Sequence, residues 1–498
     1  MRLVRFSTSD IDWFAQASHD RSPLHVDEAD ARRTAFGGRV VHGVLSVLSV
    51  LGALPLRSGV QLRRLVVEFQ RPVFPGNDYG VIVDEVTESK HAFRLLDGSL
   101  PHARGMAEVA PIAEVRRTPS ELFTAPKAME RARSWEGDEL RAGLELEVPY
   151  GMTQAAYAEL EQRFGLEARG VAPWQAMIVA GASYVVGMHL PGERALFSRL
   201  EIDFVDGGEL RGPLTFTCVT KTFDARLSVL KTAIRVRAGD SEVAAGELHA
   251  FVRRRSKGAT VTMPGAGEAP TLAGKTAVVI GASRGLGATF ATALAARGAT
   301  VLGTYARSVE EAREVAASAQ ALSGSIEMLQ GDAGSAQLSA LIRARLESEK
   351  RTIDCLFLNA APALRPLWID ESSVDRICQY VTDSLRLIAT PLATLVAAMT
   401  RDDGWVVTTS SIAVKNAVAD WPHYVAAKSA IEGLIVAAAK ENPAVSFLVA
   451  RPPALLTDFA PNLTSLHAAL PPERVAEIVL SRLLGAPARG TVELLEQF

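Results

Sequence analysis

Cysteine is scarce in this sequence, and its scarcity excludes two kinds of site. Three cysteines occur in 498 residues, at Cys218, Cys355 and Cys378, and no two of them form a Cys-x-x-Cys pair. An odd and scattered set of cysteines indicates neither a disulfide framework nor a zinc site. We expect a protein of the reducing cytoplasm with no bound metal.

Neither sign of charge predominates. The 53 lysines and arginines and the 56 aspartates and glutamates leave a formal net charge of −3. A protein that binds nucleic acid through bulk positive charge needs a basic surface that displaces counterions from phosphate. No nucleic-acid partner is therefore expected.

Long hydrophobic runs are also missing. The longest apolar stretches, Gly43–Leu56 and Leu385–Met399, each contain a proline. Both are shorter than the ~18 residues that a membrane span needs. The first residues, MRLVRFSTSDIDWF, have no apolar core and carry acids early, so no signal peptide and no membrane partner are expected.

The length and the 48% of hydrophobic residues predict large cores and roughly three domains. The stretch Arg253–Gly274 is rich in glycine, proline and alanine and lacks apolar periodicity, so residues 255–272 are predicted to be a linker. Behind it, over 273–498, strand-like runs such as TAVVIG alternate with helix-like runs such as GLGATFATALAARG. This alternation predicts an α/β domain with a doubly wound parallel sheet.

Ahead of the linker, an apolar helical stretch is followed by four strand-like stretches, and this order occurs twice. In residues 1–115 the helix is predicted at Gly38–Leu54 and the strands at Gln61–Phe74, Gly80–Thr87, His91–Asp97 and Ala103–Ala110. In residues 116–254 the helix is predicted at Trp174–His189 and the strands at Leu196–Val205, Leu214–Thr222, Leu227–Ala238 and Val243–Arg254. The repetition predicts a duplicated α+β unit whose antiparallel sheet wraps around its helix. The polar stretch Arg116–Glu147 is predicted to be a connecting helix and loop.

Four motifs follow one another in the C-terminal half. Glycines 281, 285 and 287 lie between a predicted strand and a predicted helix, where bare backbone N–H groups can approach a pyrophosphate. Asn359 and Ser411 each close a later strand. Tyr424 follows Ser411 by 13 residues, and Lys428 lies four residues beyond it, on the same helix face.

This order resembles the short-chain dehydrogenase/reductase family from about Leu272 to Phe498, and it implies a Rossmann-type fold. An isolated pair such as Tyr424 and Lys428 is more often a surface tyrosine beside a solvated lysine, but four ordered motifs favour a catalytic interpretation. A tyrosine with a pKa near about 10 is a poor proton donor at neutral pH. An ammonium group at Lys428, together with the positive charge of an oxidised nicotinamide, would lower that pKa. The resemblance implies that Ser411 holds the substrate carbonyl, Tyr424 donates the proton, and Lys428 also holds the nicotinamide ribose.

The resemblance also implies a dinucleotide site. Its predicted residues are Gly281, Ser283, Arg284, Gly285, Leu286, Gly287, Arg307, Asp332, Asn359, Ala360, Tyr424, Lys428 and Thr457. Members that prefer NAD place an acid at the end of the second strand, where this chain has Tyr305. Arg284 and Arg307 could pair with a 2′-phosphate, or they could simply be solvated, and NADPH is the predicted cofactor.

Four positions depart from the family pattern. Ile280 replaces a threonine, Ala361 replaces the last glycine of Asn-Ala-Gly, and Pro453 replaces a glycine ahead of Thr457. Asp383 occupies the position of a helix asparagine that anchors a proton-relay water. Because aspartate can also hold a water, Asp383 is predicted to be a catalytic residue. The replacement of asparagine could give a slower or retuned enzyme.

In the N-terminal half, Asp20 and His25 flank Pro23 on one short loop, and Gly43 opens the apolar helix of the first repeat. The segment FAQASHDRSPLHVDEADARRTAFGGRVVHGVL resembles the MaoC-like (R)-specific hydratase/dehydratase family. The likeness is strong over Ser7–Ala110 and extends weakly to Arg254, which implies an α+β double hotdog. Dehydration of a 3-hydroxyacyl thioester needs a base and an acid, implied at Asp20 and His25, and an N–H donor for the enolate oxygen, implied at Gly43.

Each of these residues also has a structural interpretation. Asp20 could cap a helix, His25 could belong to a capped turn, and His42 is expected to be structural. His19 and Ser22 replace the family's glycine and asparagine, so a degenerate hotdog retained for packing stays open. The second repeat has no equivalent Asp/His pair and is expected to complete an acyl tunnel. Its tryptophan, methionine and tyrosine are predicted helix core whose face could line that tunnel (Trp174, Met177 and Tyr184).

The two resemblances share one chemical intermediate. A reductase makes a 3-hydroxyacyl thioester from a 3-ketoacyl thioester, and a dehydratase removes water from it. The leading hypothesis is a bifunctional NADPH-dependent 3-ketoacyl reductase and (3R)-hydroxyacyl dehydratase in fatty-acid or polyketide-like synthesis, acting on acyl-CoA or acyl-carrier-protein thioesters. The same pair running backwards in β-oxidation with NAD, and a non-catalytic acyl-carrier-binding or assembly module, remain open. A homo-oligomer is expected from the reductase resemblance alone.

Overall fold

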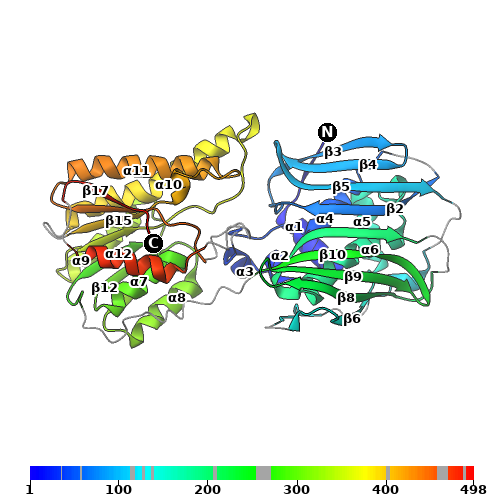
Figure 1. The fold of residues 1–498 in the computed structure, drawn as a ribbon, viewed down its shortest axis with the longest axis horizontal. Helices are drawn as coiled ribbons and strands as arrows, with labels where there is room; N and C mark the ends of the chain where they lie inside the picture. Colours follow the sequence, from blue (N-terminus) through cyan, green and yellow to red (C-terminus); the bar gives the residue numbers. More distant parts are fainter. Residues whose placement is uncertain are drawn as a thin grey trace. The chain divides into compact units, whose positions relative to one another are not determined.

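The computed structural model describes residues 1–34, 36–55, 59–112, 118–125, 129–135, 139–205, 210–253, 271–399, 404–456, 469–485 and 489–498. The chain divides into two compact units, Met1–Arg255 and Ser256–Phe498, each with its own sheet and core (Figure 1). Most of the predicted linker, residues 255–270, lies outside the described residues.

The first unit is built on a ten-stranded antiparallel sheet. Its strands are β1 (Arg2–Arg5), β2 (Val60–Phe69), β3 (Asp78–Thr87), β4 (Lys90–Asp97), β5 (Leu100–Pro111), β6 (Glu145–Tyr150), β7 (Ala195–Phe204), β8 (Leu214–Asp224), β9 (Val229–Ala238) and β10 (Ser241–Val252). Their order across the sheet is β1-β3-β4-β5-β2-β7-β10-β9-β8-β6. From the two edges inward this order is the same, with β6, β8, β9, β10 and β7 replacing β1, β3, β4, β5 and β2. The predicted duplication is therefore visible in the topology, and the β2–β7 pair joins the two copies.

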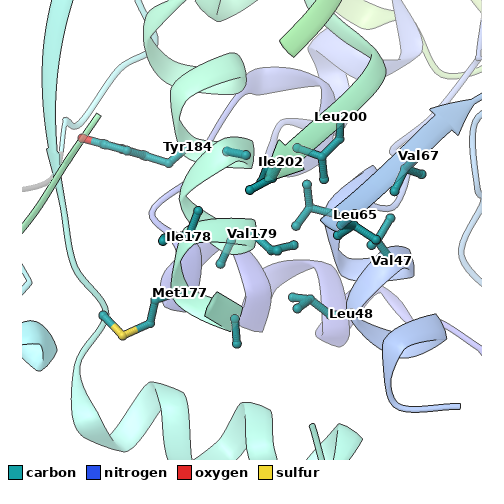
Figure 2. Close-up of a cluster of buried hydrophobic side chains, with 14 of the residues drawn as sticks. Val47, Leu48, Leu65, Val67, Met177, Ile178, Val179, Tyr184, Leu200 and Ile202 are labelled. Carbon is teal, nitrogen blue, oxygen red and sulfur yellow. The ribbon is translucent and has the colours of Figure 1, made fainter. Parts of the chain in front are cut away.

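One apolar helix from each copy packs against this sheet. These are α4 (Gly43–Leu51) and α6 (Pro173–Tyr184), which is continued by a π-helical turn, η4 (Val185–His189). Figure 2 shows Val47 and Leu48 of α4 gathered with Val179 of α6 and with Leu65 and Ile202 of the two central strands. Burial of one such aliphatic side chain stabilises a fold by about 1.5–3 kcal/mol. The core therefore lies between the helix pair and the sheet, as a double hotdog requires.

Helices that the sequence did not predict follow each edge strand. Two of them correspond: α1 (Thr8–Ser18) follows β1 and α5 (Gln154–Phe164) follows β6. Each begins after a hydroxyl N-cap, at Ser7 and at Thr153, whose side chain accepts a backbone N–H. The first copy adds two short helices, α2 (Pro23–Val26) and α3 (Glu28–Arg32).

The predicted helix in the connection Arg116–Glu147 is wrong for the residues that the structure describes there. They contain the 3-10 turn η1 (Ser120–Phe123) and the beginning of β6. Pro119 precedes the turn, and Gly143 has a φ of +82° just ahead of the strand. Neither residue favours a continuous helix, and the end of the segment, from Glu145 on, pairs with β8.

The second unit has the predicted doubly wound parallel sheet. Its strands are β11 (Thr276–Ile280), β12 (Thr300–Tyr305), β13 (Ser325–Gln330), β14 (Cys355–Leu358), β15 (Trp405–Thr409), β16 (Ser446–Ala450) and β17 (Val492–Leu495). They are parallel and follow the order β13-β12-β11-β14-β15-β16-β17. This order places a topological switch point between β11 and β14, where open α/β sheets bind ligands.

Helices cover both faces of the parallel sheet (Figure 1). They are α7 (Gly285–Ala296), α8 (Val309–Ser318), α9 (Ala336–Ser348), α10 (Val374–Leu395), α11 (Pro422–Glu441) and α12 (Pro472–Leu483). Side chains of α7, α8 and α12 share one hydrophobic core, and side chains of α9, α10 and α11 share the other. The Rossmann-type prediction is confirmed.

One helical stretch of the described residues, Glu371–Ala398, is long and apolar enough to cross a membrane by length and composition alone. It contains α10 and packs beside α11. Its Ile388, Leu392 and Leu395 belong to the core that α10 shares with α9 and α11. A core contact thus accounts for its inward-facing apolar side chains.

Candidate active sites

The glycines after β11 are required by close packing. Gly281 has a φ of +83°, and a Cβ there would lie 3.0 Å from the backbone of Ala360. A Cβ on Gly287 would meet the carbonyl oxygen of Gly281 at 1.9 Å and Nδ2 of Asn359 at 2.6 Å. The loop therefore folds tightly over the end of β14, and no side chain caps the N-terminus of α7, as a pyrophosphate site needs.

Asn359 ties together the carboxyl ends of three neighbouring strands. Its Nδ2 donates to the carbonyl oxygen of Gly281 at 3.2 Å. Its Oδ1 accepts a hydrogen bond from Oγ1 of Thr409 at 3.0 Å. Asn359 thus fixes the relative positions of the glycine loop and of the strand that leads to Ser411.

The other predicted dinucleotide residues that the structure describes follow strands at the same edge of the sheet. Ser283, Arg284 and Leu286 lie where the glycine loop enters α7, with Arg284 half-buried. Arg307 is exposed after β12, which ends at Tyr305. The remaining predicted residues are the exposed Asp332 after β13, the Ala360 that follows Asn359, and Thr457, which lies outside the described residues.

Ser411, Tyr424 and Lys428 come together at this edge. Ser411 follows β15, while Tyr424 and Lys428 occupy successive turns of α11. The two α11 side chains are 9% and 6% exposed, so the interpretation as a surface tyrosine beside a solvated lysine is wrong. Nζ of Lys428 donates to the carbonyl oxygen of Thr409 at 2.7 Å and lies 5.7 Å from the centroid of the Tyr424 ring.

Burial determines the direction of both pKa shifts here. It raises the pKa of Tyr424 above its usual value, although a hydrogen bond with Ser411 acts in the opposite direction. It lowers the pKa of Lys428 to about 8, against the attraction of Glu432. The expected lowering of the Tyr424 pKa by Lys428 is therefore not found in the chain alone, where desolvation of the phenolate outweighs the hydrogen bond with Ser411.

Two neighbours of this group carried no motif signal. Glu432, one helical turn beyond Lys428, accepts hydrogen bonds from Ser410 and Arg451. Tyr380 of α10 packs near Tyr424, and its pKa is raised first by burial and then by the electrostatic effect of Tyr424. The i, i+4 spacing of Lys428 and Glu432 could have identified the first, whereas Tyr380 comes from a distant helix.

Asp383 lies on α10 one turn after Tyr380. It is half-buried and its Oδ1 accepts a hydrogen bond from Gln379 at 2.8 Å. Among the described residues, no hydrogen bond joins it to Lys428. Its place in a proton relay stays a prediction.

In the first unit, Asp20 and His25 occupy the loop and short helix after α1. Nδ1 of His25 lies 2.8 Å from the carbonyl oxygen of Val40. Because a carbonyl oxygen only accepts, Nδ1 carries the proton and Nε2 of the neutral ring is the free base. Burial lowers the pKa of His25, although the nearby Asp20 acts in the opposite direction.

His42 supports both residues. Its ring stacks on that of His25 with 3.8 Å between centroids, and its Nε2 donates to the carbonyl oxygen of Asp20 at 3.0 Å. Burial holds the pKa of His42 well below its usual value. One ligand atom from each of Asp20, His25 and His42 lies within 4.8 Å of the others, a spacing in which a divalent cation could be held. Nε2 of His42, however, already carries a proton that it donates to the carbonyl oxygen of Asp20, so this nitrogen is not free to bind a cation.

The carboxylate of Asp20 is 2% exposed and is held from two sides. Ser22 donates its backbone N–H to Oδ1 at 3.2 Å, and Ser183 of α6 donates its hydroxyl to Oδ2 at 2.6 Å. Ser22 makes this contact through its backbone N–H, so serine can make it in place of the family's asparagine. His19 has a φ of +62°, the left-handed conformation that glycine favours.

The second copy has a leucine at the position that corresponds to Asp20. Gly165 ends α5 with a φ of +62°, as His19 ends α1, and each is followed by a buried residue, Leu166 and Asp20. The expected absence of an Asp/His pair thus has a structural counterpart in Leu166. Trp174, Met177 and Tyr184 are all buried, in keeping with the predicted helix core.

Gly43 opens α4 in a crowded position. A Cβ there would lie 2.8 Å from the ring of Phe69. His42, the N-cap residue, makes no side-chain hydrogen bond to the first turn of the helix. The N-terminus of α4 therefore offers backbone N–H donors beside His25 and Asp20.

Comparison with known families confirms both resemblances. Residues 275–466 match the short chain dehydrogenase family, and residues 3–98 match the MaoC like domain. The chain thus joins a MaoC-like dehydratase domain to a short-chain dehydrogenase domain.

Individual relatives match only parts of the chain. A 3-hydroxybutyryl-CoA dehydratase of Methylorubrum extorquens is 37% identical over 82 residues, which are 16% of this chain and 52% of the relative. An (R)-specific enoyl-CoA hydratase of Aeromonas caviae is 40% identical over 78 residues, 15% of this chain and 58% of the relative. The chain thus spans about half the length of these curated relatives. A solved short chain dehydrogenase of Burkholderia cenocepacia, in complex with NADP, is 25% identical over 45% of this chain and 98% of its own, with a TM-score of 0.42.

Proposed function

We propose that this union of a MaoC-like domain with a short-chain dehydrogenase domain is a bifunctional enzyme. It reduces 3-ketoacyl thioesters with NADPH to (3R)-3-hydroxyacyl thioesters and dehydrates these to trans-2-enoyl thioesters. The observation that carries the proposal is that one chain holds two buried polar groups, Ser411–Tyr424–Lys428 and Asp20–His25, whose reactions share an intermediate. Fatty-acid or polyketide-like synthesis is the expected setting, and a cytoplasmic location stays a prediction.

The reductase half rests on the hydroxyl pair of Ser411 and Tyr424. Both hydroxyls can donate to the carbonyl oxygen of the 3-ketoacyl group, which orients it for reduction. Tyr424 then gives its proton to the developing alkoxide, and the ammonium of Lys428 stabilises the phenolate that remains. A dinucleotide bound at Gly281–Gly287 would supply the hydride. The glycine loop fits this group, because Gly281 and Gly287 leave bare backbone at the N-terminus of α7 where a Cβ could not be accommodated.

The choice of NADPH over NADH rests on side chains at the end of β12. The strand ends at Tyr305 where an acid would bind the ribose 2′-hydroxyl. Arg307 follows it closely, and Arg284 lies at the N-cap of α7. Two guanidinium groups near one ribose would favour a 2′-phosphate.

The dehydratase half follows from the tautomer of His25. Nε2 of the neutral ring removes the C2 proton while the C3–O bond breaks, and the protonated form of Asp20 supplies the proton that turns the departing hydroxyl into water. In the reverse hydration the ionised carboxylate of Asp20 takes a proton from the attacking water, and protonated His25 returns a proton to C2. The backbone N–H groups at the start of α4, with Gly43 first, stabilise the enolate that forms on the thioester oxygen. His42 and Ser22 hold the acid and the base in place.

The reverse direction uses the same residues. The Aeromonas caviae relative is named an (R)-specific enoyl-CoA hydratase, and a hydratase coupled to an NAD-dependent dehydrogenase would serve β-oxidation. A preference for NAD over NADP of more than about tenfold, equal to roughly 1.4 kcal/mol, would favour this direction.

The proposal is tested by giving the purified chain acetoacetyl thioesters of CoA and of a carrier protein, with NADPH. We expect loss of NADPH together with formation of the enoyl product. Loss of NADPH with accumulation of the hydroxy compound would contradict the dehydratase half. No turnover of any thioester would leave the non-catalytic module as the better description.

A homo-oligomer belongs to the same proposal. Exposed apolar side chains lie on both α10 and α11, with Val374 51% and Val436 49% exposed. Pairing of these helices with a second copy would bury them. Light scattering of the purified chain should therefore give a mass above 53.2 kDa.

A further inference from the structure

We infer that Ser183 of the second repeat is a positioning residue for the Asp20 carboxylate of the first, so that the dehydratase site needs both repeats. The inference rests on the proposed function, and it assigns the second repeat a role in the chemistry beyond its predicted part in an acyl tunnel. Ser183 is separated from Asp20 by 163 residues in the sequence.

The hydrogen bond itself is short and shielded from water. Oγ of Ser183 lies 2.6 Å from Oδ2 of Asp20, and the two residues are 4% and 2% exposed. A carboxylate oxygen accepts, so the serine hydroxyl donates. A donor that reaches a carboxylate in a site with little solvent fixes its orientation more firmly than water would. Because the backbone N–H of Ser22 donates to Oδ1, both carboxylate oxygens of Asp20 accept a hydrogen bond.

The end of α6 is shaped around this carboxylate. A Cβ on Gly187 would lie 2.1 Å from Oδ1 and 2.7 Å from Oδ2 of Asp20. Gly187 belongs to the π-helical turn η4, and such turns occur frequently at functional sites. The next residue, Met188, accepts the backbone N–H of Arg21 at its sulfur at 3.2 Å. Three residues within Ser183–Met188 thus contact Asp20 or its neighbour.

Packing alone does not explain why a carboxylate occupies this buried position. A buried carboxylate costs free energy that an apolar side chain of similar size avoids. The second repeat shows that alternative, because Leu166 occupies the corresponding position after α5 and is fully buried. The Asp20–Ser183 pair therefore retains a charge where the fold also accepts a leucine.

The test follows hydration of crotonyl-CoA as a function of pH in four proteins: the full chain, Ser183→Ala, Ser183→Thr and Ser49→Ala. Ser49 is a buried hydroxyl of α4 and serves as the matched control. We expect kcat of Ser183→Ala to fall by about ten- to hundredfold, the loss of one hydrogen bond to a charged group, with KM little changed. Ser183→Thr, which keeps the hydroxyl, should recover most of kcat, and Ser49→Ala should match the full chain.

The pH profile separates positioning from packing. Because an O–H donor favours the ionised form of a carboxyl group, the acidic limb of Ser183→Ala should move to higher pH. The titratable side chains that face Asp20 are His25 of α2, His42 at the start of α4 and Tyr150 of β6, and all are unchanged in the variant. Equal losses in the alanine and threonine variants, or an alanine variant with unchanged kcat and profile, would overturn the inference.

A second measurement does not depend on turnover. The difference in Tm between the full chain and Ser183→Ala should shrink as the solution is made acidic, because the hydroxyl bonds a charged carboxylate more strongly than a neutral carboxyl group. A Tm difference that is constant with pH would overturn the inference. If the chain hydrates no thioester but shows this pH dependence, the proposed function fails while the positioning of Asp20 stands.

Discussion

Nζ of Lys428 donates to the carbonyl oxygen of Thr409 at 2.7 Å, and this bond anchors the lysine 5.7 Å from the centroid of the Tyr424 ring. The strand end that carries Thr409 is itself bonded to Asn359 and, through it, to the glycine loop. The proton donor, the lysine that supports it and the nucleotide loop are therefore held by one network at the carboxyl edge of the sheet.

The first prediction concerns the pH dependence of reduction. Burial lowers the pKa of Lys428 to about 8, so its ammonium loses a proton as the pH rises through that value. The charged form stabilises the Tyr424 phenolate left after proton transfer, so kcat for acetoacetyl-CoA reduction should fall above about pH 8. Lys428→Met should be slower and should lack this basic limb. A profile that stays flat to about pH 10, the usual range of lysine, would contradict the assignment.

The second prediction uses two glycines. Gly287→Ala places a methyl group 1.9 Å from a backbone carbonyl oxygen, so the glycine loop must shift and NADPH binding should weaken by at least about tenfold. The matched control is Gly433→Ala on α11, where a Cβ meets nothing within 4 Å. This control should bind NADPH normally and raise the free energy of unfolding by roughly 0.5–1 kcal/mol. Fluorescence titration and denaturant unfolding measure the two effects, and unimpaired binding by Gly287→Ala would refute the proposed role of the glycine loop.

The third prediction concerns the cofactor. Arg307→Ala removes one guanidinium from the end of β12 and should weaken NADPH by about 1.5–3 kcal/mol, with NADH unaffected. Tyr305→Asp should increase the preference for NADH, because the new carboxylate can bind the ribose 2′-hydroxyl and repels a 2′-phosphate. Dissociation constants for both nucleotides check this. Equal weakening of NADPH and NADH by Arg307→Ala would show that the arginine does not select the phosphate.

The fourth prediction concerns the pH dependence of dehydration. Burial lowers the pKa of His25, so its neutral, basic form persists to a lower pH than in an exposed histidine. Activity on (3R)-3-hydroxybutyryl-CoA should therefore be retained below about pH 6.5, the usual histidine value, and should be lost only at more acidic pH. His25→Gln should abolish this activity while acetoacetyl-CoA reduction continues. An acid limb above the usual histidine value would contradict the direction of the shift.

Local sequence signals were sufficient for much of the fold and for part of each site. The strands and apolar helices of both units follow from the periodicity of their side chains, and the i, i+4 spacing of Tyr424 and Lys428 places them on one helix face. Asp20 and His25 are five residues apart and needed no tertiary information. The helix predicted within Arg116–Glu147 was wrong for the described part of that segment, because polarity alone does not separate a helix from an irregular segment.

Contacts between distant segments left no such signal. Ser183 is one hydroxyl in an apolar helix, and only the pairing of the two repeats brings it to Asp20. The direction of the Tyr424 pKa shift was also missed, since the sequence shows the neighbouring lysine but not the burial that raises this pKa. The tautomer of His25 depends on the carbonyl oxygen of Val40, 15 residues away.

The most direct measurement separates the two sites in the same chain. Asp20→Asn and Tyr424→Phe are each supplied with acetoacetyl-CoA and NADPH, and with (3R)-3-hydroxybutyryl-CoA alone, and the products are identified by chiral chromatography. The account predicts that Asp20→Asn accumulates the (3R)-hydroxy compound, whereas Tyr424→Phe leaves the ketone unreduced but still forms crotonyl-CoA from the hydroxy compound. Crotonyl-CoA from Asp20→Asn at the rate of the full chain, or a hydroxy product of S configuration, would contradict it.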